Sequence, residues 1–130
     1  MKNKKPIFQS VKGMHDILPQ DQLVWEKIRQ AFKSVVEHYN FSRIDTPLLE
    51  KAELFTKGVG QGTDIVEKQM FMFETLGKEL LALRPENTAS VARAYIEHGL
   101  SHLGQPLRLY YMGPMFRYEQ PQEGRFRQFN

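Results

Sequence analysis

The sequence predicts a single α+β domain in which helices flank an antiparallel sheet. Segments with apolar residues every three or four positions are typical of helices, and they are interspersed with short segments in which apolar and polar residues alternate. The 130 residues contain no internal repeat and no linker-like tract, and 41% of them are hydrophobic, which is enough for one packed core. We therefore expect residues 1–130 to belong to one domain.

Composition excludes several classes of protein. The chain has no cysteine, so disulfides and thiolate metal sites are impossible, and its four histidines lack the close spacing of metal ligands. No apolar run approaches the ~20 residues that span a bilayer, and the basic start Met1–Lys5 lacks the apolar segment of a signal peptide. We therefore expect a cytoplasmic protein that has no membrane partner.

The net charge of +3 does not indicate a nucleic-acid-binding surface. The first 12 residues hold four of the 18 basic residues and none of the 15 acidic ones, so the rest of the chain is nearly neutral. A short lysine-rich terminus is more often a solubilising tail than an RNA-binding arm.

The first element is an amphipathic helix, predicted over Asp21–Asn40. Asp21 can cap its N-terminus and Asn40 can stop it. The apolar positions are spaced by three and four residues, and neighbouring apolar residues widen the stripe, so we expect the helix to be well buried along one side. They are Trp25, Ile28, Phe32, Val35 and Tyr39, widened by Val24, Ala31 and Val36.

A short strand and a short helix are predicted next. Phe41–Glu50 is strand-like but contains Pro47, which cannot donate to a ladder and so favours an edge strand. Lys51–Lys57 is predicted to be a helix that ends at Gly58. The three alternate glycines of Gly58–Asp64 match neither a P-loop nor a dinucleotide fingerprint, so this segment is interpreted as a loop.

The middle of the chain predicts a hairpin followed by a helix. Gln69–Glu74 and Glu79–Leu83 are strand-like, and the turn residues Thr75–Lys78 between them favour an antiparallel hairpin. A helix is predicted from Asn87 to His98, stopped by Gly99, and Arg108–Met112 then begins another strand.

The last segment, Met112–Asn130, predicts a second hairpin. Residues two apart share a face of a strand, so Arg117 and Glu119 point the same way. Gln120–Gly124 has the composition of a turn. Beyond it, Arg125, Arg127 and Phe129 share a face. Such a surface suits a phosphate chain with a flat base, although arginines on an exposed strand are also typical of a solvated edge.

Three motifs resemble a known family. Motif 2 of class II aminoacyl-tRNA synthetases is resembled by Phe116–Glu119, the loop after it and Arg125–Phe129. The segment Leu83–Ala89, read Leu-Arg-Pro-Glu-Asn-Thr-Ala, and the segment Lys12–Pro19 resemble the histidyl type of that class. The order of helix, strand and proline over Asp21–Glu50 resembles motif 1, which forms the dimer interface in the class.

The resemblance implies a fold and an activity. The chain would be the N-terminal part of a class II catalytic domain, and the rest of that domain and the anticodon-binding domain would be absent. The activity would be ATP-dependent formation of histidyl-adenylate and transfer of histidine to tRNA(His), with homodimerisation through motif 1. Mg²⁺ would arrive with ATP, without a protein metal site or a bound prosthetic group. We expect the chain alone to be inactive.

The resemblance also assigns roles to residues. Arg117 would be catalytic, because a permanently charged fork suits both the α-phosphate and the histidine carboxylate. The residues that bind histidine would be Glu86, Asn87, Thr88 and Arg117. The residues that bind ATP would be Arg117, Glu119, Arg125, Arg127 and Phe129. The tRNA acceptor end would be contacted by Gln120, Pro121, Gln122, Glu123 and Gly124. The carboxylate of Glu86 equally suits the first turn of a helix, so capping remains open beside binding.

Three alternatives remain. The synthetase-like regulatory subunit of ATP phosphoribosyltransferase typically loses the motif residues that are intact here. A glycyl-type synthetase shares a related Leu-Arg-Pro-Glu-Thr segment, but Asn87 and the segment Lys12–Pro19 favour the histidyl type. A purely structural domain that only dimerises is the third alternative.

Overall fold

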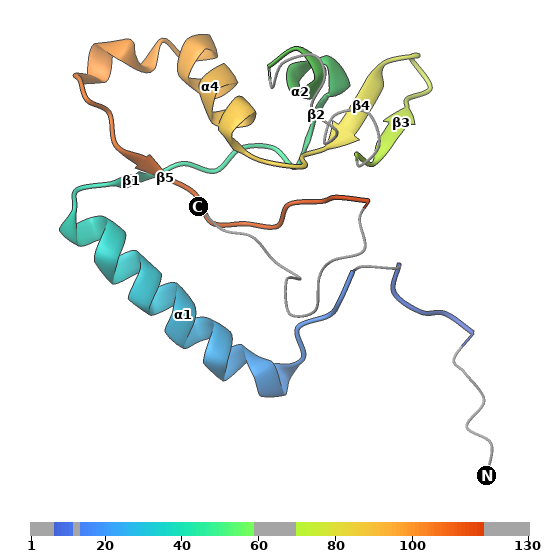
Figure 1. Ribbon diagram of the computed structural model, residues 1–130, viewed down its shortest axis with the longest axis horizontal. Coiled ribbons are helices and arrows are strands. Elements are labelled where there is room, and N and C mark those ends of the chain that lie inside the picture. Colours follow the sequence, from blue (N-terminus) through green and yellow to red (C-terminus); the bar gives the residue numbers. More distant parts are fainter. Residues whose placement is uncertain (1–6, 12–13, 59–69, 119–130) are drawn as a thin grey trace.

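The computed structural model describes residues 7–11, 14–58 and 70–118, and Figure 1 shows how their helices and strands are arranged. Helices α2 and α4 lie beside the strands β2, β3 and β4, whereas α1 extends away from this group (Figure 1). In chain order the elements are α1 (Pro19–His38), β1 (Ser42–Arg43), β2 (Leu49–Lys51), α2 (Ala52–Gly58), β3 (Met72–Glu74), β4 (Leu80–Leu83), α4 (Thr88–Glu97), the 3₁₀ helix η1 (Leu100–Leu103) and β5 (Leu109–Tyr110).

A three-stranded antiparallel sheet confirms the main fold prediction. Its order is β2-β4-β3, with Ala82 of the central strand paired to Glu50 on one side and to Met72 on the other. The predicted β3–β4 hairpin is present, and the Lys78 amide donates to the Thr75 carbonyl at 2.9 Å across its turn. Lys78 has a φ of 63° and therefore takes the left-handed position of the turn.

The pairing of β1 with β5 is parallel, which the sequence did not predict. Ser42 lies opposite Leu109 and Arg43 opposite Tyr110. The amide of Ser42 donates to the Arg108 carbonyl and that of Ile44 to the Tyr110 carbonyl, both at 2.9 Å. The long connection through the sheet and α4 allows the parallel direction, because parallel strands need a crossover and cannot be joined by a tight turn.

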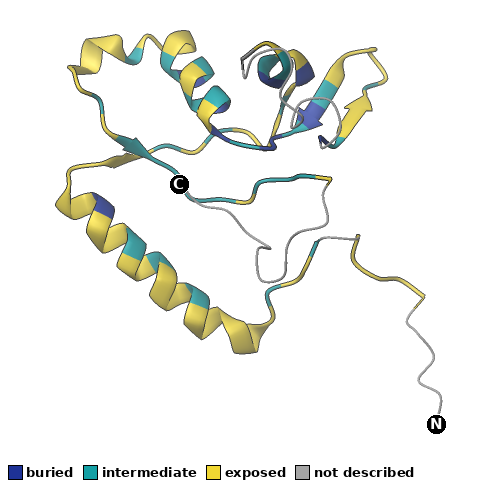
Figure 2. Cartoon of the chain, in the orientation of Figure 1, coloured by how far each residue is buried: buried dark blue, intermediate teal, exposed yellow. Residues whose placement is uncertain are grey.

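The apolar core lies between α2 and the antiparallel sheet (Figure 2). Phe55 and Ala82 are fully buried, and Ala52 and Met70 complete the cluster. Helix α4 is tied to β2 by an ion pair in which the Arg93 guanidinium lies 2.7 Å from a Glu50 carboxylate oxygen. The bond raises the pKa of Arg93.

The ends of α1 follow local chemistry. The helix begins at Pro19, two residues before the predicted start, and Asp21 lies in its first turn without acting as the cap. Proline suits the first helical position because its φ is already helical and it has no amide to satisfy. The predicted stop at Asn40 is confirmed: its φ is 57°, and the following amide of Phe41 donates to the Val36 carbonyl at 2.9 Å.

The prediction that α1 is well buried along one side is wrong for this chain. Val24 is 61% exposed and Val35 is 56% exposed, whereas Val36 is buried. The ring of Phe32 packs edge-on against Tyr110 of β5, with 5.7 Å between ring centroids. The rest of the helix points away from the sheet and the other helices (Figures 1 and 2), so its apolar stripe has little to pack against among the described residues.

Candidate active site

The loop from β4 into α4 carries the predicted histidine-binding residues. Arg84 and Asn87 are 6% and 1% exposed, and Pro85 is buried between them. Glu86 is half-buried and Thr88 is exposed, so the loop alternates buried residues with residues that reach the surface. Because α4 begins at Thr88, the free backbone amides of its first turn lie at this loop.

Glu86 caps α4. One carboxylate oxygen accepts from the Thr88 amide at 2.5 Å and the other from the Ala89 amide at 3.0 Å. Two charge-assisted hydrogen bonds therefore fix the side chain at the N-terminus of the helix. A carboxylate can accept about four hydrogen bonds, so capacity remains on both oxygens for a ligand ammonium. Capping and ligand binding are thus compatible in this geometry.

Arg117 lies against the same loop. Its Nε donates to the Pro85 carbonyl at 3.0 Å, and the amide of the preceding Phe116 donates to the Arg84 carbonyl at 2.9 Å. The structure assigns a strand only to Leu109–Tyr110 in this region. The described part of the predicted hairpin, residues 112–118, is therefore not a strand, and its Phe116 amide attaches it to the loop. The half-buried side chain of Arg117 and the Glu86 carboxylate thus belong to two segments that are bonded to each other.

A buried arginine under the loop was not recognised from the sequence. Arg84 Nη1 donates to the Thr46 carbonyl at 3.1 Å, to Thr46 Oγ1 at 3.0 Å and to Asn87 Oδ1 at 3.1 Å, while its Nε donates to the Pro114 carbonyl at 3.2 Å. Burial lowers the pKa of the Arg84 guanidinium, and the charges of Asp45 and Glu50 oppose that shift. The sequence signal that could have found it was its place in the motif Leu83–Ala89.

Asn87 and Thr88 occupy different environments. Asn87 Oδ1 accepts from Thr46 Oγ1 at 2.6 Å as well as from Arg84, and within the described residues its Nδ2 has no hydrogen-bond partner. Its side chain therefore belongs to the buried network beneath the loop. The exposed Thr88 Oγ1 lies 3.4 Å from the hydroxyl of Tyr111, a second residue that sequence reasoning missed.

The remaining predicted site residues lie outside the described ranges. These are Glu119, the loop Gln120–Gly124, Arg125, Arg127 and Phe129, together with Lys12 and Gly13 of the N-terminal motif and most of the glycine segment 58–64. The structure therefore brings together Glu86, Thr88 and Arg117 from the predicted set.

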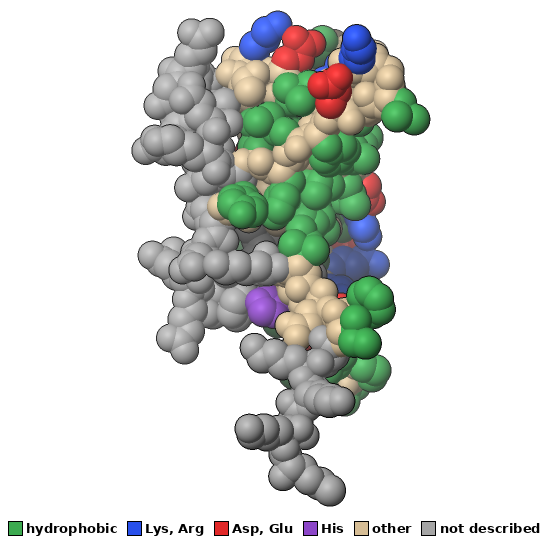
Figure 3. Space-filling model, turned by 90° about the vertical axis from the view of Figure 1, so that its right-hand side faces the viewer, with side chains coloured by type: hydrophobic (Ala, Val, Ile, Leu, Met, Phe, Trp, Pro, Cys, Tyr) green, Lys and Arg blue, Asp and Glu red, His purple; other side chains and the backbone are tan. Residues whose placement is uncertain are grey.

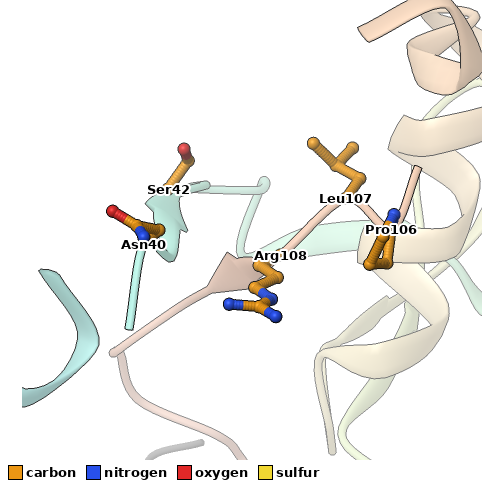
Figure 4. Close-up of a pocket in the computed structure, with 5 residues that line it drawn as sticks. All are labelled: Asn40, Ser42, Pro106, Leu107 and Arg108. Carbon is orange, nitrogen blue, oxygen red and sulfur yellow. The ribbon is translucent and has the colours of Figure 1, made fainter. Parts of the chain in front are cut away.

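A shallow open pocket lies elsewhere, between the end of α1 and β5 (Figure 4). It is lined by Asn40, Ser42, Pro106, Leu107 and Arg108, none of which is a predicted site residue. Arg108 Nη1 donates to the Tyr39 carbonyl at 3.0 Å, so this cation already contributes to the local structure.

Ranges 7–11, 14–58 and 70–118 contain no group of three or more His, Cys, Asp or Glu side chains that could hold a metal ion. In the same part of the chain, no helix combines the length and the apolar character needed to cross a membrane.

Solved structures with the same fold identify the class of protein. The apo histidyl-tRNA synthetase of S. aureus superimposes with a TM-score of 0.73 at 37% identity, covering 86% of this chain and 30% of that chain. A second solved structure, from Bacillus halodurans, is described as an ATP phosphoribosyltransferase regulatory subunit/histidyl-tRNA synthetase. It superimposes with a TM-score of 0.74 at 30% identity, covering 90% of this chain and 30% of that chain. The fold is that of aminoacyl-tRNA synthetases, as the sequence resemblance implied.

Sequence relatives narrow the class. The histidyl-tRNA synthetase family model matches residues 13–130. A histidine–tRNA ligase of Burkholderia mallei is 52% identical over 130 residues, which are 99% of this chain and 29% of the relative. A histidine–tRNA ligase of Synechococcus is 48% identical over 124 residues, which are 95% of this chain and 30% of the relative. The chain belongs to the histidyl-tRNA synthetase family. It spans about 30% of the length of these relatives.

Proposed function

We propose that this chain forms part of a histidine–tRNA ligase, which activates histidine with ATP and transfers it to tRNA(His). The observation that carries the proposal is the bond from Arg117 Nε to the Pro85 carbonyl, because it holds a permanent cation beside the loop that presents Glu86. A free amino acid has a carboxylate and an ammonium on one carbon. A cation and a carboxylate on neighbouring segments can bind both groups at once.

The reaction needs a cation where charge develops. The histidine carboxylate attacks the α-phosphorus of ATP and displaces pyrophosphate, so two anions approach each other and the phosphate gains charge in the transition state. Arg117 would contact both groups, and Glu86 would hold the ammonium while it caps α4. Thr88, which is exposed at the start of α4, would donate or accept a further hydrogen bond. We assign Asn87 to histidine binding only through the shape that it gives the loop, since its side chain is buried.

The finer assignments rest on the motif resemblance. Glu119, Arg125, Arg127 and Phe129 would bind ATP, and Gln120–Gly124 would meet the acceptor end of tRNA(His). Mg²⁺ would accompany ATP and lower the cost of bringing its phosphates near the carboxylate. We also propose a homodimer through Asp21–Glu50 and a cytoplasmic location.

A regulatory subunit remains the second candidate, because the Bacillus halodurans relative is described with both names. Such a subunit would bind histidine as a signal without activating it. The identity of 52% to a histidine–tRNA ligase and the residues Glu86, Thr88 and Arg117 favour the ligase.

A chimaera tests the proposal. In it, this chain replaces the matching segment of the Burkholderia mallei histidine–tRNA ligase. We expect histidine-dependent exchange of pyrophosphate into ATP and charging of tRNA(His). Histidine binding without either reaction would contradict the ligase proposal and support the regulatory alternative.

A further inference from the structure

The buried guanidinium of Arg84 connects three segments that are distant in sequence. Its Nη1 donates to both the carbonyl and the hydroxyl of Thr46 and to the side chain of Asn87. Its Nε donates to the carbonyl of Pro114. The segment before β2, the loop at the start of α4 and the chain leading to Arg117 therefore all meet at one side chain.

The acceptors of these four hydrogen bonds are neutral. A buried arginine normally has a carboxylate partner, because the desolvated charge is otherwise costly, and burial does lower the pKa of this guanidinium. The burial of Arg84 therefore costs free energy that the charges of Asp45 and Glu50 only partly offset. Its planar guanidinium carries several donors and can bond in different directions at once, so Arg84 can fix the relative positions of the segments that it contacts.

Gly113 supplies independent support. A Cβ at this position would lie 2.6 Å from Arg84 Nη2, so any side chain there would require the guanidinium to shift. Such a shift would strain the hydrogen bonds that Nη1 and Nε of the same guanidinium make. The absence of a side chain at Gly113 is thus matched to the position of Arg84.

We propose that Arg84 is a positioning residue for amino-acid activation, an inference that rests on the proposed function. It sets the distance between the Glu86 carboxylate, whose loop it holds through Asn87, and the Arg117 guanidinium, whose segment it holds through Pro114. Because Arg84 is only 6% exposed, it would act through Glu86 and Arg117 and not by contact with a substrate. Its contact with Thr46 extends the link to the segment between β1 and β2, within the range that resembles motif 1.

Arg84→Lys and Gly113→Ala in the chimaera test this inference. Lysine keeps the charge but cannot reach all three segments, and Gly113→Ala leaves Arg84 intact but displaces it. We expect kcat/KM for histidine to fall about 100-fold with Arg84→Lys and about 10-fold with Gly113→Ala, because a misplacement of about 1 Å can cost that much. The KM for ATP should change by less than about threefold, because Arg117 is only one of the five residues proposed to bind ATP.

Two matched variants control for general loss of stability. Arg93→Lys changes another bonded arginine, which ties α4 to Glu50. Gly77→Ala adds a methyl group where the nearest atom, Thr75 Oγ1, is at an ordinary 3.7 Å. Both should leave kcat/KM within about twofold. A loss with Arg93→Lys as large as with Arg84→Lys, or near-normal kinetics in both test variants, would overturn the proposal.

Hydrogen exchange separates this inference from the proposed function. If the unchanged chimaera is inactive, the ligase proposal fails, but the amides still report on geometry. Both variants should speed exchange at Phe116, which donates to the Arg84 carbonyl, by about tenfold or more, while Leu83, which donates to the Phe71 carbonyl, keeps its rate. Equal changes at both amides would mean that Arg84 only stabilises the fold.

Discussion

At the scale of single residues, Glu86 combines a structural role with a proposed binding role. Its two oxygens accept from the Thr88 and Ala89 amides, so the carboxylate is fixed before any ligand arrives. A fixed carboxylate loses little freedom when an ammonium binds, which favours affinity. Removal of its charge should therefore lower both the stability of the helix and the affinity for histidine, and these two effects can be measured separately.

Glu86→Gln in the chimaera is expected to raise the KM for histidine about 10- to 100-fold, with little change in the KM for ATP. A hydrogen bond to a charged group contributes about 1.5–3 kcal/mol, whereas a cap contributes about 1 kcal/mol to stability. Steady-state kinetics and a melting curve measure the two effects. Glu53→Gln in the first turn of α2 is the control and should leave histidine kinetics unchanged. A lower melting temperature with a normal KM would leave Glu86 as a cap only.

Arg117→Ala is expected to lower kcat for histidine activation by about 10²–10³-fold, the usual cost of one electrostatic contact made in the transition state. Arg117→Lys should recover only part of the rate, because a point charge cannot bridge phosphate and carboxylate as a fork does. Pre-steady-state adenylate formation at saturating ATP and histidine measures this. Arg108→Ala, which removes an exposed arginine that is bonded to the Tyr39 carbonyl, is the matched control. A normal rate with Arg117→Ala would exclude this residue from the mechanism.

At the scale of elements, the sequence predicted what depends on local patterns. The hairpin turn over Thr75–Lys78 and the helix ends at Asn40 and Gly99 follow from turn and capping chemistry, and all three are present. The parallel pairing of β1 with β5 was missed because it joins residues far apart in the chain. Two-residue strands are also too short to show a period.

The predicted site residues that the structure describes all come from recognisable motifs, and their binding roles stay predictions. Glu86, Thr88 and Arg117 come from recognisable segments, and the structure places them around one loop. Arg84 and Tyr111 carry no pattern of their own, because a buried hydrogen-bond network depends on the tertiary arrangement of its acceptors. The burial of α1 was overestimated for a related reason: an apolar stripe shows which face is apolar, and does not show whether this chain covers it.

The exposed stripe of α1 leads to a prediction about association. We expect the chain to self-associate through Asp21–Glu50, and we expect Val24→Glu with Val35→Glu to weaken that association at least about tenfold. Burying one such side chain contributes about 1.5–3 kcal/mol, and both valines are more than half exposed in the single chain. Sedimentation over a range of concentrations measures the dissociation constant.

A second apolar surface provides the comparison. Figure 3 shows apolar side chains over much of the face that carries β3 and β4, and Leu76 in their turn is fully exposed. Leu76→Glu should leave the association unchanged if α1 is the interface. If Leu76→Glu weakens it and the α1 variant does not, the copies meet through the sheet. A chain that stays monomeric at high micromolar concentration would contradict both surfaces.

At the scale of the whole molecule, the chain spans about 30% of the length of its relatives. Within the described residues, Glu86 and Arg117 are only half-buried and Thr88 is exposed, so water reaches the proposed site. Activation of an amino acid needs a site that excludes water and holds ATP as well as histidine. These observations are consistent with the proposal that this chain supplies one side of an active site.

We therefore expect the isolated chain to show no histidine-dependent exchange of pyrophosphate into ATP above the blank, while the chimaera shows it. The same assay, at equal concentrations of the two proteins, measures both. Exchange by the isolated chain would contradict this expectation and would mean that residues 1–130 complete the site without the rest of a ligase.

The parallel pairing of β1 with β5 has a consequence for how the chain assembles as it leaves the ribosome. The hairpin and the sheet β2-β4-β3 can form once residue 83 has emerged, because all their partners are then available. Strand β1 must wait for β5, and the ring of Phe32 in α1 packs on Tyr110 of the same strand. Closing such a long loop is entropically costly and slow. We therefore expect α1 and β1, although they are synthesised before the sheet β2-β4-β3, to dock after it has formed.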